Sequence, residues 1–154
     1  MLFRSLGYRG GAVVGPSALR SYLVNFSRPF IYSTAPDAAS LSVIRKAYQR
    51  QSEMGERRAR IQDLIRHFRS LAGRFPDLGF LQSSSPIQGV LVPGNQLALE
   101  AEAALAERGY FARAIRSPTV PAGGERIRLC IHAFNTESEL EEALDVLSNF
   151  LRHR

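Results

Sequence analysis

The sequence predicts an α/β fold in which helices pack against a small, partly antiparallel sheet. The first observation is the order of patterns after about residue 57, which reads helix, strand, helix, strand, strand, helix. The second is the composition, because 45% hydrophobic and 22% charged residues are ordinary for a globular protein. The third is the length of 154 residues, which allows one sizeable core and one or two compact units.

The first 55 residues contain few elements. Residues 10–15 (GGAVVG) predict a short strand, and Pro16 suits the first turn of an amphipathic helix that reaches about Phe26. Residues 28–36 (RPFIYSTAP) predict an extended segment, because the residue before a proline is disfavoured in a helix. One strand, one helix and one extended segment cannot cover both faces of a sheet. We therefore expect residues 1–55 to be an incomplete part of a larger unit.

Residues from about Ala38 to Arg74 predict a long helical region with a break near Gly55. After the break, apolar residues recur at steps of three and four, which is typical of a helix with one buried side. This stripe consists of Ile61, Leu64, Ile65, Phe68 and Leu71.

The charge is unevenly distributed. Residues 1–75 hold 13 basic and 4 acidic side chains, whereas residues 76–154 hold 7 and 10. The basic half indicates either an anionic partner or a solvated helix surface, and arginines outside the apolar stripe favour the second interpretation. Four arginines without an acidic residue in the first 36 positions resemble a mitochondrial presequence, but the strand and helix pattern argues against targeting. No apolar run approaches the roughly 18 residues that a membrane helix needs.

The carboxy-terminal part begins with an apolar strand in residues 85–93 (SPIQGVLVP). Asn95 is suited to cap a helix that Gly109 ends. Residues 110–115 (YFARAI) predict a second strand, and residues 125–133 (ERIRLCIHA) predict a third.

The third strand alternates between two kinds of side chain. Its apolar face holds Ile127, Leu129 and Ile131, and its other face holds Arg126, Arg128, Cys130 and His132. Thr136 and Glu139 have the spacing of a capping box. They open a helix whose inward side chains are Leu140, Ala143, Leu144, Leu147 and Phe150.

Cys130 is the only cysteine, which excludes an internal disulfide and fits a reducing compartment, so we expect a cytoplasmic protein. Its apolar neighbours predict a buried structural thiol. The three histidines, His67, His132 and His153, lack the spacing of metal ligands, and we expect no metal site.

Three segments carry a family resemblance over nearly the whole chain, from about Gly7 to Leu151. The segments GGAVVG (10–15), YLVNFSRPFIYSTAP (22–36) and ARAIRSPTVPAGGERIRL (112–129) occur in the family's own order. Together they resemble the carboxy-terminal part of the 8-amino-7-oxononanoate synthases, which are α-oxoamine synthases of the fold-type I pyridoxal-phosphate class. The resemblance implies that residues 56–154 are the small carboxy-terminal α/β domain. Residues 1–55 would be the tail of the large cofactor-binding domain with a connecting helix.

The resemblance also implies a reaction and its participants. Synthases of this family condense L-alanine with a pimeloyl thioester in biotin biosynthesis, release carbon dioxide and the carrier thiol, and act as homodimers with active sites at the subunit interface. It assigns Thr119 and Arg116 to substrate binding, with Arg128 supporting the same pocket. A guanidinium suits a carboxylate because it donates two parallel hydrogen bonds. Ser33 and Thr34 match a segment that reaches the cofactor phosphate of the partner subunit.

One position departs from the family pattern. The family's Schiff-base lysine corresponds to Arg4, and a guanidinium is not a usable nucleophilic amine. The only lysine, Lys46, lies in the predicted helix beside other cations. The segments that grip the cofactor ring would lie upstream of Met1, and we expect the chain alone to be inactive and to bind pyridoxal phosphate poorly.

Three interpretations stay open: a truncated or split synthase, a noncatalytic subunit that pairs with a complete synthase, and a basic anion-binding module. The absence of interleaved aromatic residues makes nucleic acid an unexpected partner for such a module. We expect a homo-oligomer or a complex with a large domain.

Overall fold

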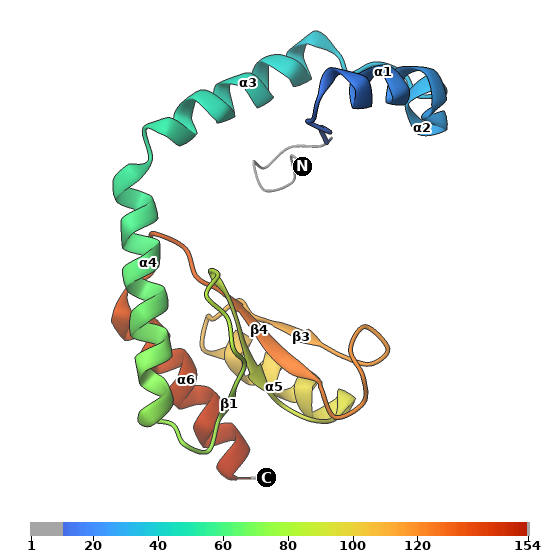
Figure 1. The fold of residues 1–154 in the computed structure, drawn as a ribbon. Coiled ribbons are helices and arrows are strands. Elements are labelled where there is room, and N and C mark those ends of the chain that lie inside the picture. The colour runs from blue at the N-terminus through green and yellow to red at the C-terminus, as the bar shows by residue number, and fades with distance from the viewer. Residues whose placement is uncertain (1–10, 154) are drawn as a thin grey trace. The chain divides into compact units, whose positions relative to one another are not determined.

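The computed structural model describes residues 11–153 and divides into two compact units, residues 1–55 and 56–154. The first unit contains helices α1 (Ser17–Phe26), α2 (Arg28–Ile31) and α3 (Ala38–Ser52). The second contains α4 (Gly55–Ser70), which begins at the boundary, a 3-10 turn η2 (Leu71–Gly73), and the whole sheet (Figure 1). No helix within residues 11–153 has the length and apolar character needed to cross a bilayer.

The first unit follows the predicted helices but not the predicted extended parts. Of the strand expected at residues 10–15, residue 10 lies outside the described chain, Gly11 forms a single bridge, and residues 12–15 have no regular structure. The prediction of an extended segment at residues 28–36 was wrong for its first part, because Arg28–Ile31 forms the short helix α2. Pro29 occupies the first turn of that helix, where a missing N–H removes no intrahelical bond.

The helix α3 begins at a cap that the sequence analysis did not identify. Asp37 precedes the helix, and its carboxylate accepts hydrogen bonds from the Ser40 backbone N–H (2.7 Å) and hydroxyl (2.5 Å). These hydrogen bonds lower the pKa of Asp37. The cap satisfies a backbone donor that the first helical turn leaves free.

The sheet of the second unit has four strands in the order β1-β2-β4-β3, and every neighbouring pair is antiparallel. The strands are β1 (Gly79–Phe80), β2 (Ile87–Leu91), β3 (Arg113–Ile115) and β4 (Arg126–Cys130). The prediction of an α/β domain is confirmed, but β1 was missed. The second predicted strand is shorter than residues 110–115. Helix α5 (Asn95–Glu107) separates β2 from β3, and α6 (Glu137–Arg152) follows β4.

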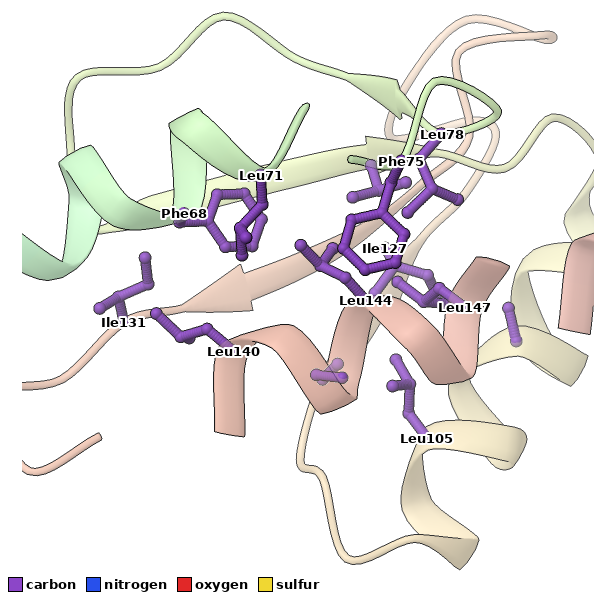
Figure 2. Packing of buried hydrophobic residues seen from close by; sticks show 14 of the residues in the cluster. Phe68, Leu71, Phe75, Leu78, Leu105, Ile127, Ile131, Leu140, Leu144 and Leu147 are labelled. Carbon is purple, nitrogen blue, oxygen red and sulfur yellow. The ribbon is translucent and has the colours of Figure 1, made fainter. Parts of the chain in front are cut away.

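The core lies between one face of the sheet and the helices α4, α5 and α6 (Figure 2). Val90 of β2 and Ile127 of β4 are partners in the ladder, and both are fully buried. Phe68 from α4 and Leu144 from α6 are buried in the same cluster. The predicted apolar stripe and the predicted inward side of the last helix therefore form one core with the sheet.

The alternation of β4 corrects one prediction. Ile127 and Ile131 are buried and Leu129 packs against the same core, so Arg128 and Cys130, which alternate with them, lie on the opposite face of the sheet. Cys130 is consequently exposed, and the prediction of a buried thiol was wrong. Arg128 is exposed on the same face.

The last helix begins with the predicted capping box. The Thr136 hydroxyl accepts from the Glu139 backbone N–H (3.2 Å), and the Glu139 carboxylate accepts from the Thr136 backbone N–H (2.9 Å). Near the end of α6, the side chains of Ser148 and Arg152 donate hydrogen bonds to the Asp77 carboxylate, at 2.6 Å from Ser148 and at 2.9 and 3.1 Å from Arg152. The Arg152 bonds, followed by the Ser148 bond, lower the pKa of Asp77 to about 2.

Acidic side chains of α6 compensate part of the basic charge on α4 and the turn after it. Arg60 pairs with Glu137 at 3.4 Å, and Arg74 pairs with Glu141. These pairs within one unit support the interpretation of the basic half as helix surface rather than as an anion site.

Glu102 of α5 links that helix to β3. Its carboxylate accepts from the Ala114 backbone N–H (2.7 Å) and from the Arg113 guanidinium (3.0 Å). The Ala114 bond is the main cause of a lowered pKa for Glu102.

Candidate functional site

The segment that joins β3 to β4 is a folded loop at the end of the sheet. The Val120 N–H donates to the Arg116 carbonyl (3.2 Å), and the Gly124 N–H donates to the Pro121 carbonyl (2.9 Å). The Ser117–Pro118 peptide bond is cis. Two successive turns therefore compact the chain between the two strands. Residues 116–125 hold two of the residues that the resemblance assigns to substrate binding, and they are called the substrate loop below.

The structure places the predicted substrate residues in exposed positions. Arg116 follows β3 directly, Thr119 lies in the middle of the substrate loop, and Arg128 is in β4. Within residues 11–153, none of the three side chains has a hydrogen bond or ion pair. Their polar groups are therefore available to a ligand.

Neighbouring arginines differ in this respect. Arg113 pairs with Glu102 at 3.0 Å, and the Arg126 Nε donates to the Gly124 carbonyl at 2.8 Å. Arg116 and Arg128 are thus the unpaired guanidiniums on the two strands and the loop in the described part of the chain. The family resemblance assigns the same two arginines to the substrate pocket, and that role stays a prediction.

The groove beside β4 is lined by only one of the three residues. Arg128 lines a groove of about 570 Å³ together with Phe111, Cys130 and Phe134, whereas Arg116 and Thr119 are not part of its wall. Arg128 faces Arg113 across the β3–β4 ladder. A common pocket for Arg116, Thr119 and Arg128 therefore stays a prediction.

Ser33 and Thr34, the residues predicted to reach a cofactor phosphate, follow α2 in the first unit. Both are exposed. The Ser33 hydroxyl already donates to the Pro29 carbonyl, but the Thr34 hydroxyl has no partner in the part of the chain that the structure describes. Because phosphate oxygens accept hydrogen bonds, Thr34 fits a phosphate contact better than Ser33.

The described residues offer no lysine suited to hold pyridoxal phosphate as a Schiff base. Arg4, which corresponds to the family lysine, lies outside the described residues. Lys46 is exposed on α3. Residues 11–153 thus offer a hydroxyl for a phosphate but no buried lysine for an aldehyde, so they do not fit the whole cofactor.

Two residues that hold the substrate loop were not predicted from the sequence. Asn95 was expected to cap α5, but Gly94 occupies the cap position with φ 107°, and the Asn95 side chain binds the Ser117 backbone instead. Glu125 is 3% exposed, and its carboxylate accepts from the backbone N–H groups of Gly94 (3.0 Å) and Gly123 (2.8 Å). These bonds, first that of Gly94, lower the pKa of Glu125. The sequence signal that could have identified Glu125 is the pair of glycines, Gly123 and Gly124, directly before it.

The sequence places the chain in a known class of protein. The family model for aminotransferase class I and II matches residues 3–147, and the chain belongs to this family.

Within it, the chain is similar to 8-amino-7-oxononanoate synthases. It is 38% identical to the synthase of Cellvibrio japonicus (strain Ueda107) over 152 residues, which cover 97% of this chain and 37% of the relative. It is 39% identical to that of Serratia marcescens over 146 residues, covering 95% and 38%. The chain therefore spans little more than a third of the length of these curated relatives.

Solved structures show the same likeness. The 8-amino-7-oxononanoate synthase of Francisella tularensis superposes with a TM-score of 0.86 at 25% identity, covering 99% of this chain and 44% of that one. A serine palmitoyltransferase from S. paucimobilis with a bound PLP-myriocin aldimine gives 0.84 at 21% identity, covering 99% and 39%. The second match concerns the fold alone.

Proposed function

We propose that the chain supplies the small domain and the substrate loop of an 8-amino-7-oxononanoate synthase. The reaction is the pyridoxal-phosphate-dependent condensation of L-alanine with a pimeloyl thioester in biotin biosynthesis. The observation that carries the proposal is the 38% identity to such a synthase over 97% of the chain. Residues 56–154 then form the small domain, and residues 1–55 belong to the large domain and its connecting helix. The single cysteine supports a cytoplasmic location.

The substrate loop supplies the binding groups in this proposal. The unpaired Arg116 guanidinium donates two hydrogen bonds to a substrate carboxylate, and the Thr119 hydroxyl adds a neutral hydrogen bond. Arg128 adds a second positive charge from β4. All three side chains are exposed and make no hydrogen bond or close ion pair among the described residues, although the Arg116 charge acts on Glu102.

Cofactor contacts are distributed between polypeptides. Thr34, with Ser33 beside it, contacts the phosphate of pyridoxal phosphate held by a partner large domain. The cofactor supplies the electron sink for the carbon chemistry when it is bound. Since Arg4 stands at the lysine position, this chain by itself does not hold the cofactor covalently. Borohydride treatment of the chain with pyridoxal phosphate should therefore leave no stoichiometric adduct on Lys46.

The proposal is tested by joining residues 7–154 to the large domain of an active synthase, which restores the lysine. The chimera should condense L-alanine with a pimeloyl thioester, whereas the chain alone should not. Arg116→Ala should weaken alanine binding by about 1.5–3 kcal/mol, or roughly 10- to 150-fold, because a hydrogen bond to a charged group is lost.

Conservative variants and a matched control sharpen this test. Arg116→Lys should rescue only in part, because an ammonium lacks the planar two-donor geometry. Thr119→Val should cost less than Arg116→Ala. Arg113→Ala removes the same charge from an arginine that already pairs with Glu102, so it should change alanine binding little. Equal effects of Arg113→Ala and Arg116→Ala would show a general charge effect and refute the assignment of Arg116.

A further inference from the structure

We infer that Asn95 and Glu125 are positioning residues. Their hydrogen bonds, called the clasp below, hold both ends of the substrate loop at residues 94 and 95, where α5 begins. The clasp thereby presents Arg116 and Thr119 in one arrangement. The inference rests on the function proposed above, and it assigns the clasp to residues that contact no substrate.

The first half of the clasp is an amide pair. The Asn95 Oδ1 accepts from the Ser117 backbone N–H (3.0 Å), and the Asn95 Nδ2 donates to the Ser117 carbonyl (3.4 Å). A side-chain amide can bind both groups because it is a donor and an acceptor at once. Ser117 directly follows Arg116 and lies two residues before Thr119, so this pair fixes the backbone between the two.

The second half is a buried carboxylate. One Glu125 oxygen accepts from Gly94 and from Gly123, and the Glu125 carbonyl accepts from the Val92 N–H (2.8 Å). Gly94 and Gly123 have φ of 107° and 83°, values that few residues other than glycine adopt. Glu125 makes no ion pair within residues 11–153, so backbone N–H groups alone satisfy its carboxylate. A carboxylate this buried needs such partners, which ties it firmly to its place.

The two halves converge on adjacent residues. Gly94 receives the carboxylate from the end of the loop, and Asn95 binds its beginning. The clasp therefore closes the loop without using the side chains of Arg116 or Thr119. A loop ordered before binding loses less entropy when a ligand arrives, which increases affinity.

Hydrogen–deuterium exchange of the full-length chain, read by mass spectrometry, tests the clasp. Glu125→Ala should raise exchange in peptides covering residues 92–96 and 117–125 by at least about tenfold, because the carboxylate loses its hydrogen bonds from Gly94 and Gly123, while β4 stays protected. Glu125→Gln keeps an acceptor oxygen and should restore most protection. Asn95→Ala, a milder change at an exposed position, should loosen residues 117–120. Glu107→Ala and Asn149→Ala are exposed controls and should change nothing.

The result has two independent parts. Unchanged loop exchange in Asn95→Ala and Glu125→Ala would overturn the clasp, whatever the enzyme does. In the active chimera, Asn95→Ala should raise the KM for alanine about five- to tenfold with little change in kcat. The reason is that the loosened loop must lose conformational entropy when alanine binds. A loosened loop with an unchanged KM would overturn the positioning role. An inactive parent chimera would refute the proposed function alone.

Discussion

Deletion of residues 1–55 should convert an associating chain into a monomeric, cooperatively folding domain. Of the 19 buried apolar side chains in residues 11–153, only Ile44 belongs to the first unit. Of the 16 large apolar side chains that are exposed in the same range, 12 belong to it. An exposed apolar surface of this kind drives association, whereas the second unit keeps its core intact after the cut.

The calorimetric enthalpy of unfolding shows how much of the chain unfolds cooperatively. At about 0.7 kcal/mol per residue near 60 °C, the 99 residues of 56–154 should unfold with about 70 kcal/mol, against about 110 kcal/mol for a chain that unfolds as one body. We expect about 70 kcal/mol for both the full chain and the shortened one, so the first 55 residues contribute little cooperative structure.

Sedimentation and calorimetry on three chains form the assay. A chain of residues 37–154 is the control, because it keeps α3 with its Asp37 cap but loses nine of the exposed apolar side chains. Association should fall mainly at this step. A full-length monomer that unfolds in a single transition near 110 kcal/mol would refute the reasoning, since the first unit would then be a complete part of the fold.

Three further predictions concern the second unit. Leu144→Ala should lower the free energy of unfolding in urea by about 2–5 kcal/mol, because the side chain is fully buried, while the half-exposed Leu99→Ala should cost far less; similar losses would contradict the core described here. Thr136→Ala should cost about 1 kcal/mol in the same assay, through loss of the helix cap, and an unchanged midpoint would show that the capping box is dispensable. The pKa of Asp77 is about 2 in the folded chain against 3.8 for the free group, so its contribution to stability is present above about pH 4 and is lost as the pH falls toward 2. Asp77→Asn should therefore flatten the acid unfolding curve measured by circular dichroism, and a curve as steep as that of the parent would exclude Asp77 as a cause.

Periodic apolar patterns predicted most of the second unit. The stripe that includes Phe68 and the alternation around Ile127 each identified a buried face, because a buried helix or strand must repeat at its own period. Thr136 and Glu139 marked the start of α6 because both partners of a capping box lie within one turn of sequence. Such signals are local, and the chain alone reveals them.

Contacts between distant residues were not predictable in the same way. Asn95 has the local signature of a helix cap, but Ser117, 22 positions away, receives its side chain. Nothing near Glu125 in the sequence indicates that it is buried, because its partner Gly94 lies 31 positions away. The two-residue strand β1 is too short for any period to be visible. The likeness to synthases selected Arg116, Thr119 and Arg128, and only the structure showed that their polar groups are unpaired.

Glu102 also limits how this domain can join other chains. β3 is a terminal strand of the sheet, and the backbone N–H of Ala114 already donates to the Glu102 carboxylate. A strand from another molecule that docked there would have to displace this carboxylate, and unpaired strand edges are the usual starting point for unwanted sheet extension. Glu102→Ala would open that edge, so we expect the variant to form intermolecular sheet on storage, whereas the native domain should not.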